Sequence, residues 1–242
     1  MSNPIVTITD VSKSFGRVNA VQTTNLTFNR GEFIGLIGHN GAGKSTLLRM
    51  LTGMLAPDTG RITIDSVDVV ANPKEARRGF GAVPESPALY EYMTAREFLD
   101  FVVTIRGGEG IEALLETLHL ASDADRLIRE YSQGMRRKTA LAAALIAKPK
   151  VIFLDESLNG LDPPSAAVVK GLLQDHVEQG GCVVLSTHVV ETVESVADRV
   201  VMMAHGSIVA DVQVGDLPDR GLETLFLEKL EQFRDAAKSD DA

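Results

Sequence analysis

The feature that most constrains the fold is a glycine-rich segment at residues 38–45, which reads G-H-N-G-A-G-K-S. It fits the pattern G-x-x-x-x-G-K-[S/T], in which glycines let backbone N–H groups converge on phosphate oxygens. An apolar run at 33–37 predicts a strand before the segment, and the pattern at 45–54 predicts a helix after it. Because a helix N-terminus favours an anion, strand, loop and helix together predict a nucleotide phosphate site. The alternative is an ordinary glycine turn in front of a helix.

Two side chains at the end of this loop carry the expected phosphate chemistry. Lys44 would neutralise β- and γ-phosphate oxygens, and the hydroxyl of Ser45 would bind Mg²⁺. The predicted nucleotide-binding residues of the loop are Gly38, His39, Asn40, Gly41, Ala42, Gly43, Lys44, Ser45 and Thr46.

A second chemical feature is the pair Asp155 and Glu156, which follows the apolar run at 151–154. A continuous apolar run is typical of a buried parallel strand, and ligands of such sheets bind at the carboxyl ends of the strands. We therefore expect Asp155 to hold Mg²⁺, through water, and Glu156 to polarise the attacking water as general base. Taken alone, the pair would suit a solvated acidic turn better, but the phosphate loop makes the metal and base roles the stronger interpretation.

Predicted strands and helices alternate along much of the chain, which indicates a largely parallel sheet. β-branched residues predict strands at the N-terminus, with a turn at Arg30 and Gly31. Helical patterns predict a helical insert after the first half of the core. We expect one α/β domain, a P-loop NTPase core with a largely parallel sheet, an N-terminal antiparallel β region and a short helical subdomain. The expected parts are residues 1–85 and 148–221 for the core, 86–147 for the helical subdomain, and 222–242 for a C-terminal helix and tail.

Composition limits the partners of the chain. Its net charge of −9 makes it a poor candidate for a general nucleic-acid binder. No apolar stretch approaches the ~20 residues that cross a bilayer, so a membrane role would require a partner protein. The N-terminus lacks a secretory pattern, and the single cysteine, Cys182, excludes a disulfide framework.

The segment 131–138, Y-S-Q-G-M-R-R-K, separates this chain from other phosphate-loop ATPases. With the two motifs above it resembles the nucleotide-binding subunit of ABC transporters, over nearly the whole chain. Ser132 and Gly134 occupy the family's signature positions, 23 residues before Asp155. Ser132 suits a helix N-cap, and Gly134 would let backbone approach an anion closely. The resemblance implies that Ser132, Gln133 and Gly134 cap the γ-phosphate bound by a second copy. Gln133 and Met135 depart from the usual glycine and glutamine.

Other segments match the same family in order along the chain. His188 resembles the switch histidine that contacts the γ-phosphate, and Phe15 occupies the position of an aromatic that stacks on adenine. Residues 159–163 resemble the loop that crosses the interface between two ATPases. Glu85 stands where glutamine is commonest, and its carboxylate could still bind Mg²⁺ or the water on it. In isolation, His188 would be interpreted as an ordinary core or surface histidine, and residues 159–163 as a simple turn before a helix.

One bacterial subgroup of the family pairs with separate membrane subunits and mostly drives export. The chain resembles this subgroup at Glu85, Tyr131, Met135 and the segment 222–226. The region 87–98 docks the membrane subunit in that family. The helical insert is short here, and glycines at 107, 108 and 110 mark the site of an apparent deletion. The shortening could change docking without changing ATP chemistry.

The resemblance implies an ATPase with ATP as its nucleotide and Mg²⁺ as its metal. Two copies, identical or paralogous, would sandwich two ATP molecules. ATP binding would close the dimer and hydrolysis would reopen it, and this cycle would drive a membrane permease. The chain would then be cytoplasmic and peripheral on the inner face of the cell membrane. Two other functions stay open: a soluble ABC ATPase acting on DNA or ribosomes, and a regulator deficient in hydrolysis. The 88 residues from Lys44 to Ser132 leave no room for the coiled coil of the DNA-tethering members, and the acidic charge also disfavours that function.

Overall fold

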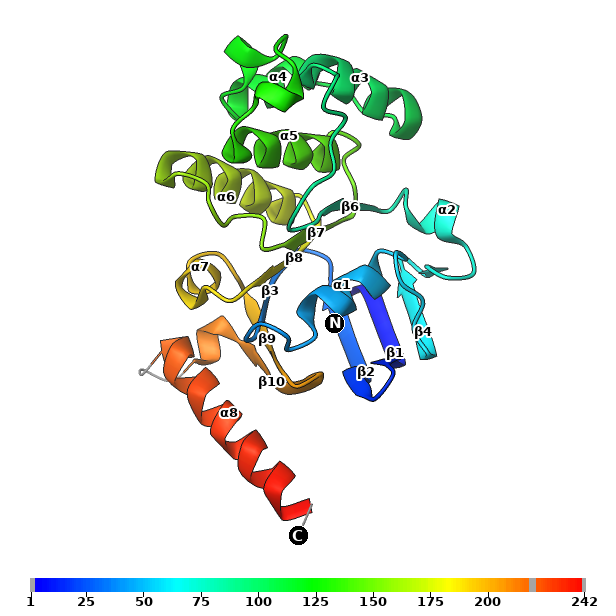
Figure 1. The fold of residues 1–242 in the computed structure, drawn as a ribbon, viewed down its shortest axis with the longest axis vertical. Coiled ribbons are helices and arrows are strands. Elements are labelled where there is room, and N and C mark those ends of the chain that lie inside the picture. The colour runs from blue at the N-terminus through cyan, green and yellow to red at the C-terminus, as the bar shows by residue number, and fades with distance from the viewer. Residues whose placement is uncertain (1–2, 218–220, 241–242) are drawn as a thin grey trace.

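The computed structural model describes residues 3–217 and 221–240, and for residues 234–240 it describes the backbone alone. Figure 1 shows two β-sheets with helix α1 near their junction and a cluster of helices at the far end of the larger sheet. The smaller sheet is antiparallel and has the strand order β2-β1-β4-β5. Its strands are β1 (Pro4–Phe15), β2 (Val18–Asn29), β4 (Thr59–Ile64) and β5 (Val67–Asp68).

The larger sheet has the order β10-β9-β3-β8-β7-β6 and is parallel except for the edge strand β10. Every residue of β3 and β8 is buried, as expected for strands covered on both faces. The predicted α/β fold with a largely parallel sheet and an antiparallel N-terminal region is confirmed. The strands are β3 (Glu32–Ile37), β6 (Phe80–Val83), β7 (Val151–Asp155), β8 (Cys182–Thr187), β9 (Arg199–Ala204) and β10 (Ser207–Gln213).

The two faces of the larger sheet bury separate hydrophobic clusters, because neighbouring strand residues point to opposite faces. In β3, Ile34 and Leu36 pack in a cluster that also holds the antiparallel sheet and α1. Phe33 and Ile37 point the other way and pack with the helices of the opposite face. This places α1 between the two sheets. The helices involved are α1 (Lys44–Leu51), α5 (Gln133–Leu145), α6 (Pro163–Glu178) and α7 (Val190–Glu194).

The predicted helical insert contains α3 (Ala95–Arg106), α4 (Ile111–Thr117) and α5, which Figure 1 shows together at one end of the molecule. Helix α3 begins with a capping box in which Thr94 and Glu97 exchange hydrogen bonds. It ends at Gly107, and the glycine turn that follows lies tightly against the end of α5. A Cβ at Gly108 would overlap the carbonyl oxygen of Ile146. Gly108 therefore permits the close approach of the shortened insert to the end of α5.

The remaining helices are α2 (Pro73–Ala76) in the core and α8 (Gly221–Asp240) at the C-terminus. Helix α8 contacts α7 and the β9–β10 hairpin. It covers most of the helix and tail expected at 222–242; residues 241–242 lie outside the described part of the chain. No helix within residues 3–217 or 221–240 combines the length and apolar character needed to cross a bilayer.

Candidate nucleotide site

The phosphate loop connects the buried end of β3 to the first turn of α1, as the sequence predicts. Its backbone depends on glycine at Gly43, which has a φ of +108°. A Cβ at this position would overlap the carbonyl oxygen of Ala20 in β2. The loop therefore lies directly against the antiparallel sheet, and its residues 40–46 line a pocket at the N-terminus of α1.

This pocket has a volume of about 600 Å³. Of the predicted site residues, it brings together most of the phosphate loop, Glu85, Glu156 and His188. His39 and Asp155 lie beside it without lining it. The residues that line the pocket are those at 40–46, those at 18–20 of β2, and Glu85, Glu156, Asn159, His188 and His205.

The two acids at the end of β7 point in different directions. Asp155 continues the strand, and its carboxylate accepts a hydrogen bond of 2.8 Å from the hydroxyl of Ser186 in β8. Glu156 then takes a φ of +49°, a left-handed backbone that costs a non-glycine residue roughly 1–2 kcal/mol. Its N–H donates to the carbonyl oxygen of Ser186. This turn directs the Glu156 side chain into the pocket, while the Asp155 side chain bonds to Ser186 of the adjacent strand β8.

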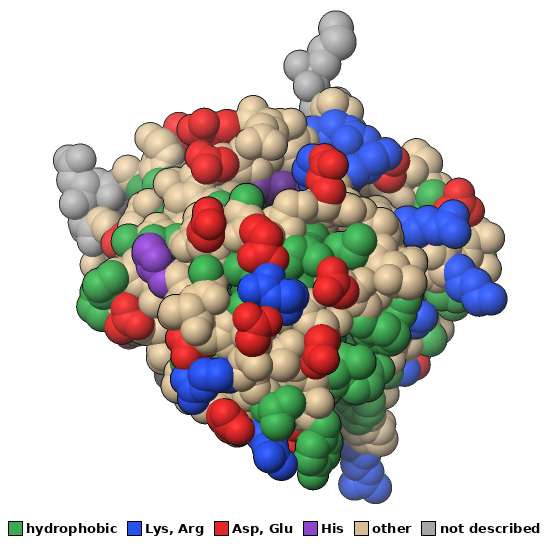
Figure 2. Space-filling view, turned by 90° about the horizontal axis from the view of Figure 1, so that it is seen from above, with side chains coloured by type: hydrophobic (Ala, Val, Ile, Leu, Met, Phe, Trp, Pro, Cys, Tyr) green, Lys and Arg blue, Asp and Glu red, His purple; other side chains and the backbone are tan. Residues whose placement is uncertain are grey.

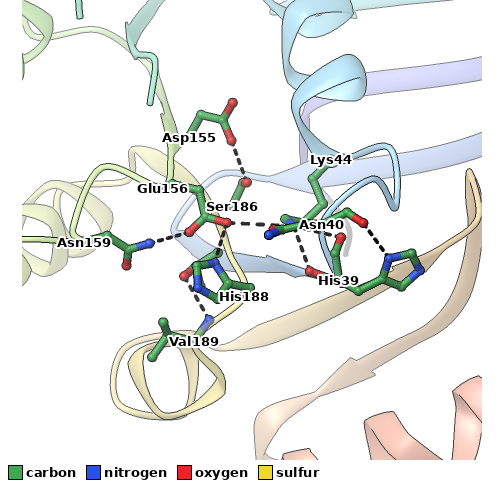
Figure 3. Close-up of polar contacts among 11 residues, drawn as sticks. His39, Asn40, Lys44, Asp155, Glu156, Asn159, Ser186, His188 and Val189 are labelled. Carbon is green, nitrogen blue, oxygen red and sulfur yellow. Dashed lines mark hydrogen bonds and ion pairs between the residues drawn. The ribbon is translucent and has the colours of Figure 1, made fainter. Parts of the chain in front are cut away.

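Three donors surround the carboxylate of Glu156 (Figure 3). The side-chain amide of Asn159 donates to Oε2 at 2.7 Å, and Nδ1 of His188 donates to Oε1 at 3.0 Å. Lys44 Nζ lies 3.8 Å from Oε1, within ion-pair range. The side chain of Glu156 is only 11% exposed. A carboxylate held by these donors at the edge of a phosphate pocket can accept a proton from a water placed there.

Lys44 is the buried cation of the site. Its ammonium donates to the carbonyl oxygen of Gly38 at 2.7 Å, and its side chain is 6% exposed. Burial lowers the pKa of Lys44, and the nearby carboxylates of Glu156, Asp155 and Glu85 oppose this effect. Because burial disfavours the charged ammonium, a phosphate in the pocket would supply the negative charge that favours it.

The oxygen donors around the pocket fit Mg²⁺. Ser45 and Glu85 line the pocket, and Asp155 lies beside it, next to Ser186. The described residues contain no group of three or more His, Cys, Asp or Glu side chains that could enclose a metal ion. This pattern suits Mg²⁺, which is usually held by one or two carboxylates, a hydroxyl, waters and substrate phosphates.

Besides Gly38 and His39, four predicted nucleotide contacts do not line this pocket. Phe15 ends β1, is 52% exposed and does not line the pocket, although its hairpin neighbours at 18–20 do. Ser132, Gln133 and Gly134 are at the start of α5. Ser132 is the helix N-cap, as its sequence position predicts, and its hydroxyl accepts from the N–H of Met135. A Cβ at Gly134 would meet Leu161 and the carbonyl oxygen of Gly160 at ordinary contact distance.

Sequence reasoning missed three contacts of the site. Asn159 was assigned only to an interface loop, and its bond to Glu156 depends on the backbone turn at that glutamate. Ser186 could have been found from strand register, since it pairs with Asp155 across β7 and β8. No sequence signal identified His205, which reaches the pocket from the β9–β10 turn.

Comparison with known proteins places the chain among the subunits of one transporter family. A family model described as "ABC transporter" matches residues 21–159. The chain is 37% identical to Nod factor export ATP-binding protein I of Rhizobium etli, over 88% of this chain and 70% of that protein. It is 34% identical to ABC transporter ATP-binding protein NatA of Bacillus subtilis, over 85% of this chain and 88% of that protein. A solved structure titled "Structure of ATP binding subunit of ABC transporter" superposes with a TM-score of 0.88 and 28% identity, covering 93% of this chain and 99% of that one.

Proposed function

Because the chain belongs to the ABC transporter family of ATP-hydrolysing subunits, we propose that it powers export through a separate membrane permease. The observation that carries the proposal is the convergence of Lys44, Glu156, Asn159 and His188 on one phosphate pocket. Several relatives have names that refer to export or drug resistance, including proteins for Nod factor and daunorubicin. These names support export as the direction of transport.

In the proposed mechanism, each group of the pocket has a separate task. The N–H groups of residues 40–46 and the ammonium of Lys44 hold the ATP phosphates. Glu156 accepts a proton from the attacking water, and His188 and Asn159 keep its carboxylate in place. Ser45, Glu85 and Asp155 would hold Mg²⁺, which neutralises phosphate charge when bound. Phe15 would stack on adenine at the mouth of the pocket.

A second copy of the chain completes each site in this proposal. Ser132, Gln133 and Gly134 lie at the start of α5, beside Gly160 and Leu161 and away from the pocket of their own chain. A capped helix N-terminus has N–H groups suited to an anion. The three residues therefore contact the γ-phosphate bound by the partner copy, and ATP holds the two copies together.

The permease docks on a groove of about 470 Å³ beside the helical subdomain. The exposed side chains of Met54 and Ile105 supply apolar surface, and Arg77 and Arg78 lie exposed in the same groove. Figure 2 shows hydrophobic side chains gathered toward one edge of the helical-subdomain face. Exposed aromatic residues of the neighbouring segment, Tyr90, Tyr92 and Phe101, extend this surface toward the expected docking region at 87–98. The chain is then a peripheral subunit on the cytoplasmic face of the membrane.

Comparison of wild type with Glu156→Gln tests the enzymatic part of the proposal. Hydrolysis should fall by about 100-fold or more, because a general base contributes on that scale. The variant should also form a dimer in ATP and Mg²⁺, measured by light scattering. The exposed Glu116→Gln in α4 is the matched control and should hydrolyse ATP like wild type. Wild-type hydrolysis by Glu156→Gln would contradict the base assignment, and failure to dimerise would contradict the shared site.

A further inference from the structure

The β9–β10 turn is attached to the phosphate loop by its backbone. Gly206 N–H donates to the carbonyl oxygen of Ala42 at 2.9 Å, and its carbonyl oxygen accepts from Gln22 of β2 at 2.8 Å. The preceding residue, His205, has a left-handed φ of +47° and lines the nucleotide pocket. A displacement of this turn would therefore also move the phosphate loop and strand β2, to which it is hydrogen-bonded.

The imidazole of His205 contacts two other rings. One is His39 of the phosphate loop, with ring centroids 5.0 Å apart. The other is Phe233 of α8, with centroids 6.0 Å apart and ring planes within 10° of parallel. His39 donates from Nδ1 to the carbonyl oxygen of Asn40, while its Nε2 is buried with no hydrogen-bond partner within the described residues.

The opposite end of α8 packs against α7. Leu222 is fully buried, and its N–H donates to the carboxylate of Glu194 in α7 at 2.8 Å. Helix α7 begins two residues after His188, which holds Glu156. Leu225 and Phe226 continue the apolar contact against the core. From Leu222 to Phe233, α8 rises by eleven steps of ~1.5 Å, which is about 17 Å in all. The helix therefore connects α7, which follows His188, to His205 in the β9–β10 turn.

We propose that α8 supports the nucleotide pocket from outside and that Phe233 is a positioning residue, which holds His205 against the phosphate loop. Loss of the Phe233 ring leaves one face of His205 without its packing partner and loosens the pocket wall. Coupling between two sites is reciprocal, so nucleotide in the pocket also stabilises the docked position of α8. The inference depends on nucleotide binding by a single chain and does not require the second copy or the permease.

The first test measures binding of a fluorescent ADP analogue to the full chain in Mg²⁺. Phe233→Ala should weaken binding about three- to tenfold, the range expected for loss of an aromatic pair. The KM for ATP should rise similarly while kcat at saturating ATP stays within about twofold. Phe233→Tyr keeps the ring and should bind like wild type. Leu227→Ala removes an exposed side chain of the same helix and is the matched control.

A double-mutant cycle separates this coupling from a general loss of helix stability. If Phe233 acts through His205, then His205→Ala alone and the double variant should weaken ADP binding by similar factors. Hydrogen exchange in residues 222–233 should slow when ADP binds to wild type and should respond less in Phe233→Ala. The proposal would be overturned by additive effects in the cycle, by wild-type binding in Phe233→Ala, or by hydrogen-exchange rates in residues 222–233 that do not change when ADP binds.

Discussion

At the scale of single residues, the position of Glu156 could be predicted from the sequence but its backbone conformation could not. An acid directly after a buried apolar strand could be expected at the ligand edge of the sheet, and Lys44 and His188 could be expected near it. The left-handed backbone at Glu156 could not be predicted, because the motif contains no glycine at that position. That turn brings the carboxylate within 2.7 Å of Asn159. The bond to Asn159 therefore follows from a local conformation and not from residue spacing.

This contact predicts the behaviour of Asn159→Ala. A hydrogen bond to a charged group contributes about 1.5–3 kcal/mol, so loss of it should reduce kcat by roughly 10- to 100-fold. The KM for ATP should change little, since Asn159 holds the base and Lys44 holds the phosphates. Steady-state kinetics with Asn72→Ala as control checks this, because Asn72 is exposed and its side chain does not cap α2. An unchanged kcat would mean that Glu156 keeps its position without Asn159.

At the scale of elements, strongly patterned segments were predictable and short ones were not. The apolar runs of β3, β7 and β8 and the spacing of α3 indicated their type and place. Strand β6 has only four residues and lies beside β7 at the edge of the sheet, so its own pattern carries too little signal. Helix α1 ends at Leu51, three residues before its predicted end, because Gly53 takes a φ of +64°. The position of a short strand such as β6 and the exact end of a helix such as α1 depend on the neighbouring structure.

Two helix N-termini allow a matched test of the signature segment. Ser132 caps α5 and Thr94 caps α3, each accepting a backbone hydrogen bond of 3.2 Å. Alanine at either position should cost about 1 kcal/mol, a fall in Tm of roughly 2–4 °C for a chain of this size. Only Ser132→Ala should also reduce ATPase activity, by more than tenfold, if its helix end contacts a partner's γ-phosphate. Equal activities for Ser132→Ala and Thr94→Ala would assign Ser132 a purely structural role.

At the scale of the whole molecule, the distribution of charge could not be predicted from the total. The chain carries a net charge of −9, yet Lys74, Arg77, Arg78 and Arg106 all line one groove. They come from α2, the segment after it and the end of α3, and the fold alone brings them together. Arg106 donates to the backbone carbonyl oxygens of Arg77 and Phe80, which ties α3 to the core beside the groove. A permease loop with acidic and apolar side chains would complement this surface.

Charge reversal in the groove should therefore separate docking from catalysis. Arg77 is exposed and lies outside the nucleotide pocket, so Arg77→Glu should leave ATP hydrolysis by the isolated subunit unchanged. It should lower the fraction of the chain that sediments with membranes of cells producing the whole transporter by several-fold. Lys148→Glu is the matched control, since Lys148 is 75% exposed and lies outside the groove. Added salt should weaken wild-type sedimentation, because exposed charges are screened over ~8 Å at physiological ionic strength. Equal sedimentation of the two variants would mean that the permease does not bind at this cationic groove.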